Sequence, residues 1–192
     1  MDPSQLLQLI KQRRSVYPKN FIDQAIPNEK IDQMLEAANW APTHKFTEPW
    51  RFIVFRGEGL NKLADFQAER YKLTSTVEKF NPSRYKKLKL KPLLCSHVIA
   101  ICMVRDSTES VPEVEEVCAV ACAVQNMLLM ASSLGIGCYW GTGGVTYDSK
   151  GKDFFDLSEE DKLMGFLYIG ASLSVTGQGK RSDIKSKTTW VD

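Results

Sequence analysis

The chain has 192 residues, of which 43% are hydrophobic and 25% charged, and its formal net charge is +2. This length suffices for one full hydrophobic core, so we expect a single domain over residues 1–192. Because neither sign of charge forms a long block, the sequence gives no reason to expect nucleic acid or a membrane surface as the main partner. The one basic run, residues 86–91, is interpreted as a solvated loop.

Five cysteines stand at positions 95, 102, 118, 122 and 138, mostly in apolar segments and without a CxxC pair. This pattern is typical of buried, reduced thiols in a cytoplasmic protein. Cys118 and Cys122 share a helix face, but two thiols without further ligands make a poor metal site, so no metal is expected. The first residues lack the apolar core of a signal peptide, which also indicates the cytoplasm.

The first half of the chain predicts two helices, a loop, a strand and a third helix. Apolar side chains recur with helical spacing at residues 4–14 and 28–38. Two prolines make the stretch 42–49 irregular. Residues 50–56 are rich in aromatic and β-branched types and predict a strand, and 60–79 follow as a charged, peripheral helix.

The second half predicts a central helix among three strands. Residues 97–104 and 163–170 are continuous apolar runs, as in strands buried on both faces. Between them, 117–134 contains four polar residues and predicts a helix that must be covered nearly all round. Gly135 suits the end of this helix, and a short strand at 138–140 follows.

Strands separated by helices, with an apolar helix at the centre, indicate a layered α/β or α+β fold. No internal repeat, linker or low-complexity segment divides the chain. The sequence has no GxSxG, HExxH, Walker A or GxGxxG motif. The glycines at 135 and 137 precede a strand, whereas those of a dinucleotide fingerprint follow one, which argues against a Rossmann site.

What remains is a set of residues without an obvious nucleophile. Guanidinium and ammonium groups with a hydroxyl donor suit a doubly charged phosphate, and glycine beside an aromatic residue lets backbone amides approach a flat ring. A protein with such residues borrows the chemistry of a cofactor. The set comprises Arg13, Arg14, Ser15, the loop 42–50, Trp140, Gly141, Thr142, Lys180 and Arg181.

At these residues the sequence resembles the FMN-dependent nitroreductase family, in its compact bacterial branch. The resemblance covers nearly the whole chain. It implies a three-layer fold in which helices flank a central mixed sheet around a central buried helix. The features that carry it, in order, are Arg13-Arg14-Ser15, residues 37–42, residues 49–54, the glycines 135 and 137 before Trp140-Gly141-Thr142, residues 166–170 and a basic tail with Trp190.

The resemblance also implies a homodimer with two FMN molecules at the subunit interface. NAD(P)H reduces the flavin, and a nitro compound, a quinone or a similar small molecule reoxidises it in a ping-pong cycle. Thr43, His44 and Lys45, with Trp40 nearby, match a loop that reaches the flavin from the opposite subunit. Two alternatives stay open: a flavin-consuming enzyme or reductive dehalogenase of the same fold, and a non-catalytic flavin-binding protein.

The phosphate contacts of the family match both ends of the chain. Arg13 and Ser15, with Arg14, match the first FMN contact. Lys180 and Arg181 fall where the C-terminal phosphate contacts lie. The resemblance therefore implies that both termini meet at one phosphate.

The segment Trp140, Gly141 and Thr142 matches the stretch beside the flavin ring. A backbone N–H of Gly141 or Thr142 is expected near flavin N5, which carries the chemistry, so no catalytic side chain is expected. A fixed dipole at that point would cost no reorganisation.

The sequence departs from the family pattern at two positions. Tyr17 stands where a lysine or arginine often lies near the pyrimidine end of the flavin, and Lys19 or Lys45 could replace that charge. Glu48 stands in place of a common glutamine. The first change bears on how the reduced flavin is stabilised, and the second on acceptor preference.

Overall fold

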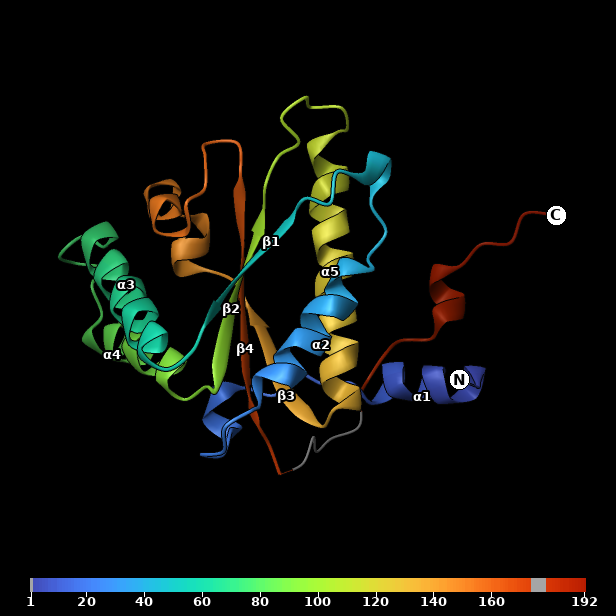
Figure 1. The fold of residues 1–192 in the computed structure, drawn as a ribbon, viewed down its shortest axis with the longest axis horizontal. Coiled ribbons are helices and arrows are strands. Elements are labelled where there is room, and N and C mark those ends of the chain that lie inside the picture. Colours follow the sequence, from blue (N-terminus) through green and yellow to red (C-terminus); the bar gives the residue numbers. More distant parts are fainter. Residues whose placement is uncertain (1, 174–178) are drawn as a thin grey trace.

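The computed structural model describes residues 2–173 and 179–192. In this part of the chain the strands form one sheet in the order β1-β2-β4-β3, with helices on both faces (Figure 1). The strands are β1 (Trp50–Phe55), β2 (His97–Met103), β3 (Ile136–Gly141) and β4 (Lys162–Ala171). The α-helices are α1 (Pro3–Gln12), α2 (Asn28–Asn39), α3 (Glu58–Thr74), α4 (Pro82–Leu93) and α5 (Glu113–Ser133).

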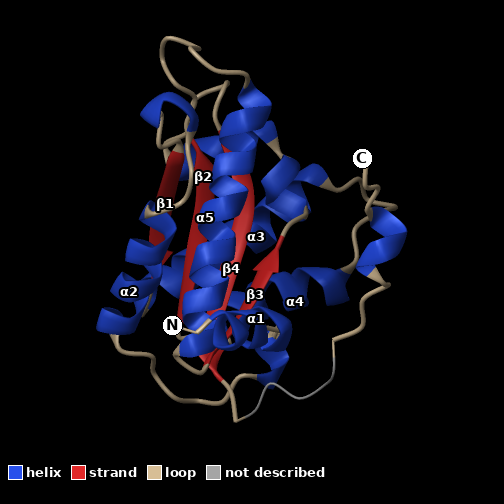
Figure 2. Cartoon of the chain, turned by 90° about the vertical axis from the view of Figure 1, so that its right-hand side faces the viewer, coloured by secondary structure: helices blue, strands red, loops and turns tan. Residues whose placement is uncertain are grey.

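The elements form three layers. Helices α2 and α5 cover one face of the sheet, and α3 and α4 cover the other (Figures 1 and 2). Two short 3₁₀ helices, η3 (Gly144–Tyr147) and η4 (Ser149–Phe155), join β3 to β4 on the side of α3. The layered fold class predicted from the sequence is confirmed.

The sheet is antiparallel at every pairing among the described strands, so the expectation of a mixed sheet is wrong. Strands β2 and β3 run in the same direction and are joined by the long crossover α5, as in a parallel pair. They do not pair with each other, because β4 lies between them and Ile169 faces both His97 of β2 and Cys138 of β3. The last strand therefore fills the gap that the crossover leaves, and it runs antiparallel to both neighbours.

Helix α5 packs against the sheet by one stripe of side chains. Gly135 follows the helix with φ of +70°, a left-handed conformation that glycine adopts without strain, as the sequence predicted. The buried stripe recurs every three or four residues and is made of Glu116, Ala119, Val120, Ala123, Val124, Met127 and Ala131. Small alanines in this stripe let the helix lie close to the strands.

The outer side of α5 is exposed to solvent. The sequence predicted a helix buried on nearly all sides, whereas the structure buries only the side that faces the sheet. Val114 is 63% exposed, and Cys118 and Cys122 are exposed rather than buried as predicted. Helix α5 is long and apolar enough to cross a membrane, but its buried stripe packs on the sheet as in the core helix of a globular protein. An apolar surface of this kind needs a further partner.

The basic run at 86–91 lies in α4 and not in a solvated loop, which corrects the expectation from the sequence. The helix starts because Pro82 takes its first position and the side chain of Asn81 accepts hydrogen bonds from the backbone N–H groups of Ser83 and Arg84, at 2.9 and 3.1 Å. Residues 179–192 form an exposed tail that extends away from the body of the chain (Figure 1).

Candidate functional site

Strand β3 lies at the edge of the sheet, so no described strand pairs with its outer side. The backbone N–H of Val16 donates to the carbonyl of Cys138 at 2.8 Å, which shows that the peptide groups of Cys138 point outward. Because peptide direction alternates along a strand, the groups of Trp140 also point outward, whereas those of Gly141 face its partner on β4. The same alternation, continued past the strand, turns the N–H of Thr142 to the open edge.

Trp140 is fixed by a β-bulge in the neighbouring strand. Its indole Nε1 donates to the carbonyl of Met164 at 3.1 Å. Met164 is the extra residue of β4 where the register with β2 shifts, next to Gly165 with φ of +117°. A Cβ atom at Gly165 would lie 2.6 Å from the carbonyl oxygen of Gly141 and 3.0 Å from the indole nitrogen. Only glycine therefore allows this close crossing beside the edge.

The residues after α1 form a cationic cluster with the C-terminal tail. A Cβ atom at Gly179 would lie 2.4 Å from Nη2 of Arg14, so the tail passes directly against this guanidinium and leads into Lys180 and Arg181. Arg13 precedes Arg14 at the end of α1, and both are half-buried. In the described part of the chain, no carboxylate forms an ion pair with any of these four cations.

The cluster has an unmet need for an anion. Nη1 of Arg14 donates to the carbonyl of Arg13 at 2.8 Å, but its Nε is buried without a hydrogen-bond partner among the described residues. A buried donor without an acceptor costs about 1–3 kcal/mol, and more for a charged group. Ser15 adds an exposed hydroxyl next to Val16. These donors fit a phosphate group, whose oxygens accept several hydrogen bonds.

The cationic cluster and the Trp140–Gly141–Thr142 segment share the edge of β3. Val16 is bonded to Cys138, three residues before Gly141, which corresponds to about 10 Å along a strand. A molecule that lies along this edge therefore reaches from the arginines to the glycine.

The loop between α2 and β1 lies at the other end of α5, away from the arginines (Figure 1). His44 Nδ1 contacts the carboxylate of Glu115 in the first turn of α5, and Lys45 Nζ donates to the carbonyl of Ser110 at 2.8 Å. Trp40 is 78% exposed. Since α5 has 21 residues and is about 30 Å long, one chain does not bring this loop to Arg13.

The same loop stores backbone strain. Lys45, Phe46 and Glu48 all have positive φ, at 51°, 56° and 41°. Strained, exposed backbone of this kind is typical of binding loops. Phe46 is 87% exposed and was missed by the sequence analysis, although an aromatic residue in a loop between two prolines was a usable signal. Thr43 holds the loop through its hydroxyl, which accepts from the backbone N–H of Glu48 at 3.1 Å.

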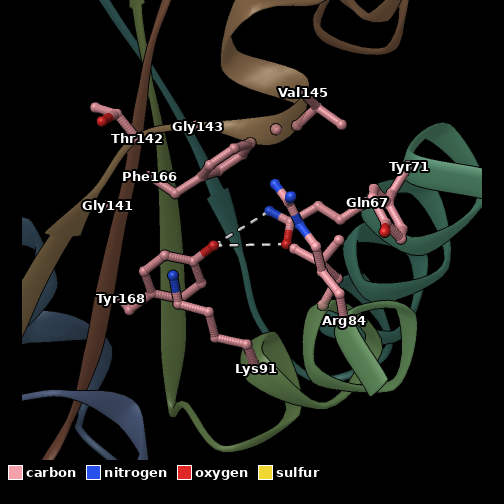
Figure 3. A pocket seen from close by; sticks show the side chains of 12 residues that line it. Gln67, Tyr71, Arg84, Lys91, Gly141, Thr142, Gly143, Val145, Phe166 and Tyr168 are labelled. Carbon is pink, nitrogen blue, oxygen red and sulfur yellow. Dashed lines mark hydrogen bonds between the residues drawn. The ribbon is translucent and has the colours of Figure 1, made fainter. Parts of the chain in front are cut away.

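A cavity of about 140 Å³ lies behind the glycine segment, between β3, β4 and the helices α3 and α4 (Figure 3). Gln67 donates its amide to the hydroxyl of Tyr168 at 3.3 Å across its floor. The turn after β3 closes one side, and α4 contributes the opposite wall. The lining residues are Gln67, Tyr71, Arg84, Leu88, Lys91, Gly141, Thr142, Gly143, Gly144, Val145, Phe166 and Tyr168.

Lys91 lines this cavity and was not among the site residues predicted from the sequence. Its ammonium lies 3.8 Å from the ring centre of Tyr168 and 4.8 Å from that of Tyr139. It would lie 3.1 Å from a Cβ atom at Gly141. Burial lowers the pKa of Lys91 to about 8. The ring of Tyr17 also packs against Tyr139, with centroids 4.6 Å apart, so the lysine and Tyr17 both contact the ring of Tyr139.

Comparison with known proteins identifies the relatives of this chain. The model of the nitroreductase family matches residues 10–171, which include all four strands and the arginines after α1. YfhC of Bacillus subtilis (strain 168), named as a candidate NAD(P)H nitroreductase, is 28% identical over 191 residues, which cover 97% of this chain and 94% of YfhC.

Solved structures show the same likeness. A nitroreductase-like family protein from Bacillus cereus superposes with a TM-score of 0.85 at 29% identity, over 97% of this chain and 96% of that one. The FMN-dependent nitroreductase NfnB from Mycobacterium smegmatis, in complex with NADPH, has a TM-score of 0.76 at 15% identity and covers 100% of both chains, which shows a shared fold. Since the family model spans most of the sequence and the fold agrees, the chain belongs to the nitroreductase family.

Proposed function

We propose that this protein is an FMN-dependent oxidoreductase that takes electrons from NAD(P)H and passes them to nitro compounds, quinones or similar small acceptors in a ping-pong cycle. The observation that carries the proposal is one sheet edge that joins an unneutralised cationic cluster to a glycine segment with outward peptide groups. YfhC is named for NAD(P)H, and NfnB is FMN-dependent and was solved with NADPH, which supports the same cofactors here.

The phosphate of FMN is held by the cationic cluster. Arg13, Arg14, Lys180 and Arg181 supply positive charge, and Ser15 supplies a hydroxyl. The buried Nε of Arg14, which has no partner among the described residues, gains an acceptor when the phosphate is present. The phosphate therefore relieves the cost of the unpaired donor and is shared by the end of α1 and the tail.

The flavin ring lies beside Trp140, Gly141 and Thr142. FMN supplies the redox chemistry, since it accepts electrons from NAD(P)H and passes them to the acceptor. The N–H of Thr142, rather than that of Gly141, is turned to the edge and stabilises the negative charge that reduction places on the ring. Lys91 adds a full positive charge behind Gly141, which replaces the basic residue that Tyr17 displaces and makes Lys19 and Lys45 unnecessary for this role.

The site is completed by a second copy of the chain. The loop with Trp40, Thr43, His44 and Lys45 lies at the far end of α5 and contacts the flavin of the partner. The homodimer covers the open side of α5, where Val114, Cys118 and Cys122 line an apolar groove next to this loop. Light scattering checks this: a stable, FMN-loaded monomer at micromolar concentration contradicts the shared site.

The protein acts as a single domain over residues 1–192, in the cytoplasm, without a nucleic acid or membrane partner. The decisive experiment is a visible spectrum of the purified protein followed by anaerobic addition of NADPH. A yellow protein that bleaches, and regains its colour when a nitro compound or a quinone is added, supports the proposal. A yellow protein that neither NADH nor NADPH bleaches is instead a flavin-binding protein without this activity.

A further inference from the structure

Arg84 lies at the outer end of the cavity behind Gly141, on the same face of α4 as Lys91. The two residues are seven positions apart, which places them about two turns and 10 Å from each other along the helix. Leu88 lies between them and lines the same cavity. The inner end of the cavity, at Lys91, lies against the glycine segment. The outer end of the cavity, at Arg84 and Tyr71, can receive a second molecule.

Arg84 is stacked but not neutralised. Its guanidinium carbon lies 4.9 Å from the ring centre of Tyr71 on α3. In the described part of the chain, neither Arg84 nor Lys91 forms an ion pair with a carboxylate. A stacked guanidinium keeps the N–H groups at its edge free, and these bind a carboxylate or phosphate with two parallel hydrogen bonds.

Two other basic residues of α3 and α4 have acidic partners, whereas Lys86 and Lys87 on α4 form no ion pair among the described residues. What distinguishes Arg84 from these two lysines is that it lines the cavity. Arg70 of α3 pairs with Asp148, and Lys89 of α4 pairs with Asp65 at 3.0 Å. Figure 3 shows that Arg84 reaches from α4 into the cavity, where the amide of Gln67 is already bonded to the hydroxyl of Tyr168. The guanidinium is therefore the free charged donor at the outer end.

We propose that Arg84 determines specificity by binding an anionic group, a carboxylate, sulfonate or phosphate, on the molecule that exchanges electrons at this site. Leu88 and Phe166, which line the same cavity, give apolar contacts for the ring of such a molecule. This inference rests on the proposed function, because it assigns a preference among the substrates of that activity. The anionic group belongs either to the acceptor or to the 2′-phosphate of NADPH, and the experiment separates these sources.

The test uses the FMN-loaded protein with 4-nitrobenzoate and 4-nitrobenzamide, which share ring and size and differ in charge. In Arg84→Ala, kcat/KM for the benzoate is expected to fall about tenfold, as for the loss of a charge-assisted hydrogen bond on an exposed side chain, and that for the amide by less than about twofold. Arg84→Lys restores part of the preference, because it keeps the charge but loses the bidentate geometry. Lys86→Ala is the matched control, since it removes one charge from the same helix outside the cavity.

A binding measurement keeps this test independent of turnover. The dissociation constant of 4-nitrobenzoate for the oxidised, FMN-loaded protein, from the change in flavin absorbance, rises about tenfold in Arg84→Ala and stays constant in Lys86→Ala. If only the KM for NADPH rises while that for NADH does not, the anion is the nucleotide phosphate and Arg84 keeps its role. Equal changes for benzoate and amide together with equal changes for NADPH and NADH, or equal losses in Arg84→Ala and Lys86→Ala, overturn the inference. A protein that binds nitrobenzoate through Arg84 but is not reduced by NAD(P)H refutes the proposed function alone.

Discussion

The two layers that cover the sheet are built from different chemistry. The side of α2 and α5 is packed with aliphatic side chains, alanines and methionines, among them Met34 and Met127, which are fully buried. The side of α3 and α4 packs aromatic rings, such as Phe166 and Tyr168, around a cavity that contains unpaired cations. The buried aliphatic side chains complete their packing within the chain, whereas an unpaired cation needs a further group.

This difference separates stability from function. A buried methionine contributes through area and contacts that are complete in the folded chain. Lys91 instead loses water on folding and gains only ring contacts among the described residues, so the folded chain bears a cost that a ligand can relieve. We therefore expect mutations in the first layer to change the free energy of unfolding and mutations near the second to change binding and turnover.

The largest effect on stability is expected for Met34→Ala in α2. Met34 is 0% exposed, and its truncation leaves a cavity that typically costs about 2–5 kcal/mol of unfolding free energy. Urea unfolding at one fixed protein concentration measures this cost. The control Leu73→Ala removes a side chain that is 73% exposed on α3 and should change stability by less than about 0.5 kcal/mol. A similar loss in both variants would contradict the contrast between the layers.

Gly141→Val tests the functional layer and should lower the rate of flavin reduction about a hundredfold, as for the loss of one preorganised donor. A Cβ atom there would lie 2.8 Å from the ring of Tyr139 and 3.1 Å from Nζ of Lys91, so valine displaces the lysine and the edge. Stopped-flow reduction by NADPH, normalised to flavin content, gives the rate. In the control Gly59→Val, the new Cβ meets Phe55 at an ordinary 3.8 Å, and the rate should stay close to the wild-type value. A wild-type rate in Gly141→Val means that the segment is only structural.

Arg13→Ala tests the cationic cluster. The loss of a charge-assisted contact of about 1.5–3 kcal/mol should weaken FMN binding roughly ten- to more than a hundredfold. Arg13→Lys should recover only part of the affinity. Titration of the apoprotein with FMN, followed by flavin fluorescence, measures the dissociation constant. Lys11→Ala removes one charge from the same helix and serves as the control, and equal weakening in both variants would assign the effect to net charge.

Lys91→Met should have the smallest effect on stability, and the size of this effect depends on pH. The pKa of Lys91 in the folded chain is about 8, below its ordinary value of 10.5. The unfolded chain therefore binds more protons between these values, so protonated Lys91 opposes folding below pH 8 and this penalty disappears as the pH rises to about 10.5. We expect the apo form of Lys91→Met to be slightly more stable than wild type at pH 7, and the difference to shrink at higher pH.

The unfolding free energies of both proteins at pH 7 and pH 9.5 check this prediction, and a difference that grows with pH would refute it. The same variant should lower the reduction potential of bound FMN, because the reduced ring loses a nearby positive charge. An unchanged potential would remove Lys91 from the flavin site while leaving its effect on folding intact.

Local signals in the sequence predicted much of the fold. The run at 97–104 is continuously apolar, and β2 is buried along its whole length. The end of α5 was also predictable from the sequence, because glycine adopts the left-handed conformation that Gly135 has after the helix without strain. The arginines after α1 and the Trp140 segment stood out for the same reason: their chemistry is expressed in short, contiguous stretches.

The sequence by itself therefore determined the four strands, the α-helices other than α4, the family resemblance and the candidate residues within each segment. Only the tertiary structure decided that β4 enters between β2 and β3, that Lys91 lies behind Gly141, and that the loop at His44 lies a full helix length from Arg13. Local preferences depend on neighbours within about one turn of helix or a few strand residues, so a sequence pattern expresses them directly. Contacts between segments tens of residues apart depend on which surfaces pack together, and that is fixed only when the whole chain folds.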